Sequence, residues 1–179
     1  GGGEPMSWVV RRDARHSKLE AITLISAALT IDLAFPPKSM WVVSPWVSDI
    51  QVLDNSFGGF GGLFATAKPR LSDVLHTLAA KGTSIVLVAK DVETNRPFVQ
   101  SLESIRSRLP VPGKLAVRLD NNSRLHTKAI VSEGYVVSGS MNFTRAGTML
   151  NDELIELRTE SAYVAESRIA AQALYGGSL

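Results

Sequence analysis

The chain has 179 residues, of which 45% are hydrophobic and 20% charged, a composition that predicts one packed domain and excludes a disordered chain. The formal net charge is only +2, so charge alone favours anionic partners weakly. Because cysteine is absent, disulfides and thiolate metal sites are excluded, and no apolar run reaches the about 18 residues of a membrane span. We therefore expect a single soluble, cytoplasmic domain over residues 1–179, with no membrane partner, in which residues 1–5 are a tag remnant or disordered.

The first predicted element is an amphipathic helix, because apolar residues recur at mostly helical spacing across Ser17–Thr30. Basic side chains precede or open this segment, at Arg11, Arg12, Arg15 and Lys18. Two interpretations of this basic group stay open. It is either a solvated face of the molecule or a contact to the phosphate backbone of a nucleic acid.

A short buried strand is predicted next, over Met40–Ser44, and Pro45 ends it and turns the chain. In sheets flanked by helices, functional sites gather where strands end. Ser44, at the end of this strand, is therefore a candidate substrate contact.

A loop rich in glycine and phenylalanine is predicted over residues 51–67, with five residues of mainly glycine at its centre, Gly58–Gly62. Phe57, Phe60 and Phe64 alternate with these glycines. The loop is either a mobile surface segment whose aromatics pack onto the core, or a flap that covers the substrate and stacks on a base. It does not end in Gly-Lys-Ser/Thr, so it is not a phosphate-cradling P-loop.

Helices and strands alternate after this loop. Pro69 begins a helix in its first turn, and Gly82 lies just past the end of that helix. The following elements are a buried strand over Thr83–Ala89, a helix over Asn95–Leu109 and a strand over Leu115–Leu119.

The last third of the chain predicts a hairpin, one further strand and a closing helix. The elements are strands at Leu125–Ser132 and Tyr135–Ser140 joined at Glu133-Gly134, a helix or turn at Phe143–Met149, a strand at Glu153–Arg158, and a helix at Glu160–Tyr175 with Ala162, Ala165, Ile169 and Ala173 available to pack. Strands separated by helices early, with a hairpin late, predict an α/β fold in which a mixed sheet is sandwiched between helices.

The strand over Leu125–Ser132 carries an imidazole and an ammonium. Side chains alternate between the faces of a strand, so His126 and Lys128 project to the same side. Such a pair costs desolvation energy in a core strand unless an anion is present. The ammonium also disfavours protonation of the imidazole, which keeps His126 neutral and nucleophilic at neutral pH.

Groups that suit a phosphoryl anion follow this pair along the chain. Gly139 permits a close backbone approach, and the Ser140 hydroxyl and the Asn142 amide can donate hydrogen bonds to phosphate oxygens. The carboxylate of Glu153 can accept a hydrogen bond from the second nitrogen of His126 and fix its tautomer. Each residue alone is ordinary, and only their order and spacing indicate a site.

The order of these residues resembles the HxK…D…GSxN signature of the phospholipase D superfamily, in the form found in its small bacterial endonuclease branch. The matching residues are His126-x-Lys128, Glu133, Gly139-Ser140-x-Asn142-x-Thr144 and Asn151-x-Glu153. Glu133 stands where the family has Asp, and the hairpin is one residue shorter than usual. The overall pattern is also similar to the DpdK-type phospholipase D-like proteins, which are found beside DNA-modification or defence genes.

The resemblance implies a phospholipase D/nuclease fold and a phosphodiesterase that needs neither metal nor cofactor. It implies catalytic roles for His126, Lys128, Asn142 and Glu153, substrate contacts from Ser140, Thr144 and Ser44, and supporting structural roles for Glu133 and Gly139. Because His126-x-Lys128 is the one HxK sequence with the surrounding motif, and His16 and His76 lack it, the chain carries one half-site, and the resemblance also implies a homodimer. One His126 would form a phosphohistidine, and the partner's His126 would protonate the leaving oxygen.

The leading hypothesis is therefore a nuclease that acts on DNA or RNA. The first alternative is a hydrolase of lipids or other small phosphodiesters, although no amphipathic membrane-binding stretch supports it. The second alternative is a non-catalytic dimeric nucleic-acid-binding module, in which the change at Glu133 has weakened the site.

Overall fold

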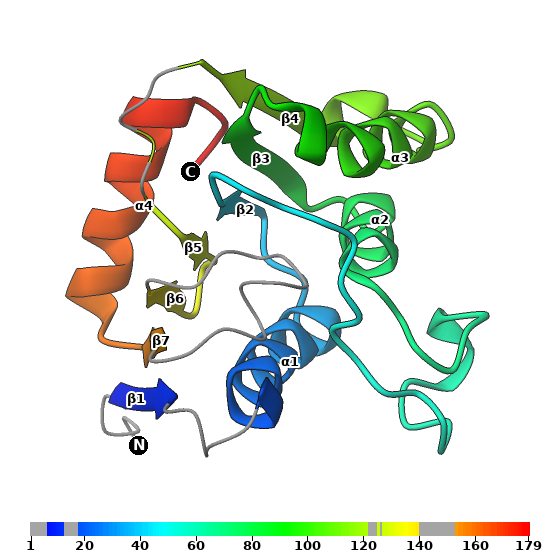
Figure 1. The fold of residues 1–179 in the computed structure, drawn as a ribbon, viewed down its shortest axis with the longest axis horizontal. Coiled ribbons are helices and arrows are strands. Elements are labelled where there is room, and N and C mark those ends of the chain that lie inside the picture. The colour runs from blue at the N-terminus through cyan, green and yellow to red at the C-terminus, as the bar shows by residue number, and fades with distance from the viewer. Residues whose placement is uncertain (1–6, 13–17, 122–124, 126, 140–152) are drawn as a thin grey trace.

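The computed structural model describes residues 7–12, 18–121, 125, 127–139 and 153–179, and only the backbone at 8–12, 18–21 and 153–154. Within these residues, seven strands form one sheet in the order β1-β7-β6-β5-β2-β3-β4 (Figure 1). The strands are β1 (Ser7–Arg12), β2 (Ser39–Val43), β3 (Ser84–Lys90), β4 (Leu115–Asp120), β5 (Ala129–Val131), β6 (Val136–Gly139) and β7 (Glu153–Arg158). The α-helices are α1 (Lys18–Ala34), α2 (Leu71–Ala80), α3 (Arg96–Arg106) and α4 (Ser161–Tyr175).

The sheet has a parallel half and an antiparallel half. β2, β3 and β4 run parallel to one another, with α2 and α3 as the connections between them. β5 pairs antiparallel with β2, and each further strand on that side is antiparallel to its neighbour, ending with β1. The mixed sheet that the sequence predicts is therefore confirmed.

Alternate residues of each strand pack against different helices. On β2, Met40 and Val42 belong to the apolar core that α1, α2 and α3 complete. Trp41 and Val43 face the other way, into a smaller core with Val164 of α4. In Figure 1 α4 accordingly lies across the sheet from the other three helices. The predicted α/β sandwich, with helices on both faces, is thus confirmed.

The N-terminal strand β1 has no counterpart in the sequence prediction. Its backbone pairs with β7 through six register pairs, from Ser7 opposite Arg158 to Arg12 opposite Glu153. The run from Trp8 to Val10 has the β-branched and aromatic character of a strand, but it is too short to be distinctive. Its pairing partner lies over 140 residues later, so local patterns cannot reveal it. The basic residues Arg11 and Arg12 thus belong to an edge strand.

β5 is much shorter than the predicted strand Leu125–Ser132. It pairs with β2 only from Val43 opposite Ala129 onwards. At Ser44 the β2 chain turns away, and its backbone N–H donates to the carbonyl of Val88 at 2.9 Å. The register pairs between β2 and β5 therefore begin at Ala129, and Lys128 immediately precedes β5.

The closing helix α4 buries a face different from the predicted one. Val164 and Ala171 are its buried apolar residues, whereas Ala162, Ala165 and Ala173 are exposed and Ile169 is 58% exposed. Alanines occur all around this helix, so the apolar pattern does not select one face. Tertiary packing against β5 decides the orientation.

The loop over residues 51–67 buries one of its aromatic side chains and exposes another, and the interpretation as a substrate-covering flap stays a prediction. Phe64 is buried and meets the ring of Phe60 edge-on at 5.9 Å, whereas Phe57 is 99% exposed. Asn55 braces the loop, because its backbone N–H donates to Ala67 at 2.7 Å and its side-chain oxygen accepts from the N–H of Phe60 at 3.1 Å. Pro69 precedes the N-cap residue of α2 instead of lying in its first turn.

None of the helices in the described part of the chain combines the length and apolar character that a membrane crossing requires.

Candidate active site at one end of the sheet

The strand register gathers several predicted site positions at one end of the sheet. β2 and β6 end there, and β5 and β7 begin there. Val43 lies opposite Ala129, Ala129 lies opposite Ser138, and Gly139 lies opposite Ile155. Lys128 therefore lies between the ends of β2 and β6, and the backbone of Glu153 enters β7 at the same end.

Lys128 and Gly139 are directly joined. The backbone N–H of Gly139 donates to the carbonyl of Lys128 at 3.1 Å, which continues the β5–β6 ladder by one step. The Lys128 side chain is half-buried. A half-buried ammonium beside a glycine-lined strand end is suited to neutralise an anion that approaches the backbone closely. The catalytic role of Lys128 stays a prediction.

Ser44 is 1% exposed and shapes the turn at the end of β2. Its hydroxyl donates to the carbonyl of Trp46 at 2.6 Å, while its backbone N–H bonds to β3. Because the hydroxyl proton is used within the chain, the oxygen can only accept further bonds. The structure thus shows Ser44 as a brace of this turn, and its contact with a substrate stays a prediction.

A residue that the sequence did not single out, Asn95, fastens this turn to the end of β3. Asn95 is 1% exposed, and its Nδ2 donates to the carbonyls of Pro45 and Lys90, each at 2.9 Å. Its Oδ1 accepts from the backbone N–H of Val47 at 2.9 Å. An asparagine at the start of a predicted helix suggests a cap, so only the tertiary structure reveals this clamp.

The same turn presents an aromatic and a cationic side chain. Trp46 is 41% exposed, and Nζ of Lys90 lies 4.5 Å from the centroid of its ring. This distance is within the range of a cation–π interaction. Neither residue belongs to the predicted site, although both lie at the site end of β2 and β3.

Glu133 lies at the opposite end of β5 and β6, in the hairpin turn. The turn is closed by the backbone N–H of Ser132, which donates to the carbonyl of Tyr135 at 3.0 Å. Glu133 is 3.9 Å from Nη2 of Arg168 on α4, with its side chain 40% exposed. The short hairpin therefore closes with Glu in this position, and the predicted supporting role of Glu133 stays a prediction.

Several predicted site residues lie outside the described residues. These are His126, Ser140, Asn142, Thr144 and Asn151. Their predicted roles stay predictions, as does the role of the Glu153 side chain. Among the described residues, no group of histidines and carboxylates is arranged to hold a metal ion.

A buried carboxylate ties α1 to the hairpin. Asp32 is 3% exposed and accepts hydrogen bonds from the hydroxyls of Ser132 at 2.8 Å and Tyr135 at 2.6 Å. Burial raises the pKa of Asp32 to about 6, although both hydrogen bonds lower it. The pKa of Tyr135 is raised well above its usual value by burial and by the Asp32 carboxylate.

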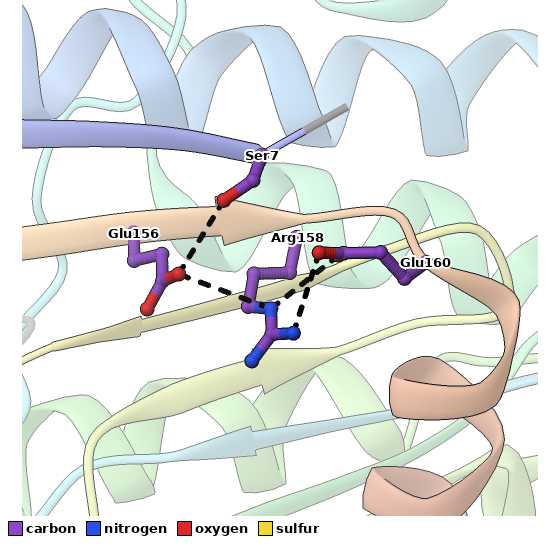
Figure 2. Close-up of polar contacts among 4 residues, drawn as sticks. All are labelled: Ser7, Glu156, Arg158 and Glu160. Carbon is purple, nitrogen blue, oxygen red and sulfur yellow. Dashed lines mark hydrogen bonds and ion pairs between the residues drawn. The ribbon is translucent and has the colours of Figure 1, made fainter. Parts of the chain in front are cut away.

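A second polar cluster holds β1, β7 and α4 together (Figure 2). Arg158 lies 3.3 Å from Glu160 and 3.8 Å from Glu156, which also accepts from Ser7 at 3.5 Å. The guanidinium stacks on the ring of Tyr163 at 3.7 Å. Hydrogen bonding to Glu160 raises the pKa of Arg158. The pKa of Glu160 is lowered, mainly by a backbone hydrogen bond and next by the hydrogen bond from Arg158. These partners satisfy one another, which indicates a structural role.

Comparisons with known proteins agree with this architecture. A family model described as "Cardiolipin synthase, PLD-like domain" matches residues 61–172, well over half of the chain. No curated protein matches the sequence.

Solved structures share the fold at low sequence identity. NucT from Helicobacter pylori superposes with a TM-score of 0.61 at 12% identity, covering 95% of both chains. Nuc from Salmonella typhimurium, a phospholipase D family member, superposes with a TM-score of 0.58 at 19% identity, covering 96% of this chain and 94% of Nuc. TrmBL2, an archaeal chromatin protein with a novel mode of DNA binding, superposes with a TM-score of 0.54 at 14% identity, covering 96% of this chain and 53% of TrmBL2.

Proposed function

The chain belongs to the phospholipase D superfamily, and we propose that it is a phosphodiesterase of the nuclease type that acts on DNA or RNA. The observation that carries the proposal is the gathering of Lys128, Gly139 and the start of β7 at one end of the sheet. The HxK and GSxN motifs adjoin this end in the sequence. A phosphoryl group placed here meets a cation and close-lying backbone together.

In the proposed mechanism, the neutral imidazole of His126 attacks phosphorus. A phosphorus–nitrogen bond forms, the phosphorus–oxygen bond of the leaving group breaks, and the His126 of a second copy gives its proton to the leaving oxygen. That second imidazole then takes a proton from water, and the resulting hydroxide releases the phosphoryl group from His126. Lys128 and Asn142 neutralise the charge that develops on the phosphate oxygens, and Glu153 orients His126.

We propose that the second histidine comes from another copy of the chain, because His16-x-Lys18, the other HxK sequence, lacks the surrounding motif. His76 lies half-buried in the middle of α2, away from strand ends, which makes it a poor second catalyst. We therefore propose a homodimer with the two half-sites facing each other across a twofold axis.

Two observations bear on the substrate. TrmBL2, which shares the fold, is a chromatin protein that binds DNA, and this supports a nucleic acid over a lipid. The same similarity favours the second candidate function, a dimeric nucleic-acid-binding module without catalysis. The resemblance to DpdK-type proteins supports the proposal that such a nuclease acts in DNA modification or defence.

The decisive experiment is His126→Ala, assayed in EDTA on single- and double-stranded DNA, on RNA and on phosphatidylcholine vesicles. We expect cleavage of a nucleic acid by the parent protein and a loss of at least about a thousandfold in the variant, since the nucleophile is removed. His76→Ala is the matched control and should cleave like the parent. Undiminished cleavage by His126→Ala would refute the mechanism. Strand binding without cleavage by the parent would favour the non-catalytic module, and cleavage of lipid alone would favour the lipid hydrolase.

A further inference from the structure

Trp46 and Lys90 form an unusual pair at the end of the sheet. Large aromatic side chains in a folded chain are mostly buried, and Trp41, only five residues earlier, is 0% exposed. Trp46 leaves 41% of its surface exposed, with the Lys90 ammonium 4.5 Å from its ring centroid. An exposed aromatic ring beside a cation is suited to a flat ligand that carries negative charge.

The pair is held rigidly. Nδ2 of Asn95 donates to the carbonyl of Pro45, which precedes Trp46, and to the carbonyl of Lys90. The N–H of Lys90 also donates to the carbonyl of Pro45, at 3.1 Å. The Ser44 hydroxyl fixes the carbonyl of Trp46 itself. The Trp46 backbone therefore loses little conformational freedom when a ligand binds, which favours affinity.

The pair lies near the proposed phosphodiester site. β5, β2 and β3 are consecutive strands of the sheet, so Lys128 and Lys90 are separated by two strand spacings, or roughly 10 Å. A polynucleotide whose phosphate lies at Lys128 has further bases and phosphates within this distance. A small phosphodiester has none.

We propose that Trp46 and Lys90 form a nucleotide-binding platform, in which Trp46 stacks on a base of a single-stranded segment and Lys90 contacts a phosphate of the same strand. The inference rests on the proposed function, from which it takes a nucleic acid as the substrate. It adds that the bases themselves are recognised by stacking. Stacking accepts every base, so the platform selects single strands over lipids without sequence preference.

Binding of labelled strands tests the proposal, with His126→Ala in every protein so that the strands stay intact. The probes are an oligothymidylate and a strand of equal length whose sugars lack bases. The parent should bind the oligothymidylate more tightly than the abasic strand. Trp46→Ala should lower the affinity for the oligothymidylate by about 5- to 100-fold and bring the ratio of the two affinities towards one. Trp46→Phe, which keeps a ring, should fall between the two.

Matched controls come from the opposite end of the sheet. Phe35 is 80% exposed and precedes β2, so Phe35→Ala removes an exposed ring far from the platform and should keep the parental ratio. Lys90→Met should weaken both strands alike and reduce the salt slope of log affinity by about 0.7, one phosphate contact, whereas Lys38→Met should leave the slope unchanged. Melting curves of each variant identify any that fail to fold.

An unchanged affinity ratio in Trp46→Ala would overturn the platform, as would an equal loss on both strands or a similar loss in Phe35→Ala. Failure of the proposed catalysis is separable. Base-dependent binding in the His126→Ala background, together with no cleavage by the protein that retains His126, would leave the platform standing and refute the nuclease. Cleavage by the protein that retains His126, with no base dependence of binding, would do the reverse.

Discussion

The buried carboxylate of Asp32 gives the protein a pH dependence opposite to that of an ordinary aspartate. Its pKa is about 6 in the folded chain, because burial outweighs the hydrogen bonds from Tyr135 and Ser132, and about 3.8 in the unfolded chain. Between these values the folded state binds more protons than the unfolded state. This carboxyl group therefore lowers the free energy of unfolding as pH rises from about 4 to about 6, and its contribution is constant outside that window.

The size of the effect follows from the difference in pKa. About two pH units at about 1.4 kcal/mol each amount to about 3 kcal/mol of lost stability across the window, to order of magnitude. Asp32→Asn removes the titration while keeping a side chain that can accept from one hydroxyl and donate to the other. Relative to the parent, the variant should gain about 3 kcal/mol between pH 4 and pH 7.

Urea unfolding of both proteins at half-unit pH steps measures this difference, and it cancels the contributions of all other carboxylates. Asp91→Asn, an exposed aspartate after β3, is the control and should follow the parent at every pH. Tyr135→Phe removes the 2.6 Å hydrogen bond that lowers the Asp32 pKa, so it should extend the upper end of the window above pH 6 and leave the lower end in place. A difference between Asp32→Asn and the parent that does not change with pH would refute the reasoning.

Three further changes test the packing, and each is measured by urea unfolding. Gly177→Ala should lower the free energy of unfolding by about 1–3 kcal/mol, because φ is +96° and the added Cβ would lie 2.9 Å from Val86. Gly134→Ala is the control and should be nearly neutral, because the added Cβ meets open space. Equal effects of the two substitutions would contradict this reasoning. Asn95→Ala should lower the free energy of unfolding by about 1–3 kcal/mol, because the buried N–H of Val47 loses its acceptor, while the carbonyls of Pro45 and Lys90 lose the Asn95 donor but keep the N–H groups of Lys90 and Val92. A loss well below about 1 kcal/mol would show that the clamp is dispensable. Arg158→Lys should lower stability only slightly, since the ion pair with Glu160 is about a third exposed. A loss as large as that of Asn95→Ala would mean that stacking on Tyr163 dominates.

Elements with a strong local signal could be predicted from the sequence. The continuous apolar run before Lys90 is typical of a strand that is buried on both faces. It forms β3, in the centre of the parallel half of the sheet. The predicted bounds of β7, Glu153–Arg158, are the observed ones. The predicted hairpin around Glu133-Gly134 forms as β5 and β6, and a backbone hydrogen bond joins Lys128 to Gly139 just beyond β5.

What the sequence does not reveal depends on partners far away in the chain. β1 acquires strand pairing only because β7 lies beside it, and the start of β5 is decided by where β2 turns away at Ser44. Asn95 has the local features of a helix cap, but its bonds go to Pro45 and Val47, about 50 residues earlier. The orientation of α4 is set by packing, because its alanines allow several faces to be buried.

The two ends of the sheet carry different chemistry, and this separates stability from activity. Asp32 accepts a hydrogen bond from Ser132, which lies four residues after Lys128. At the rise of a strand, Ser132 and Lys128 are roughly 13 Å apart. Over that distance, a charge acts weakly on groups near solvent, because salt screens it. The pH profile of cleavage would then be set by groups other than Asp32. Asp32→Asn should therefore flatten the stability curve while the pH profile of cleavage keeps its inflections, and a profile that shifts with this substitution would show that the two ends are coupled.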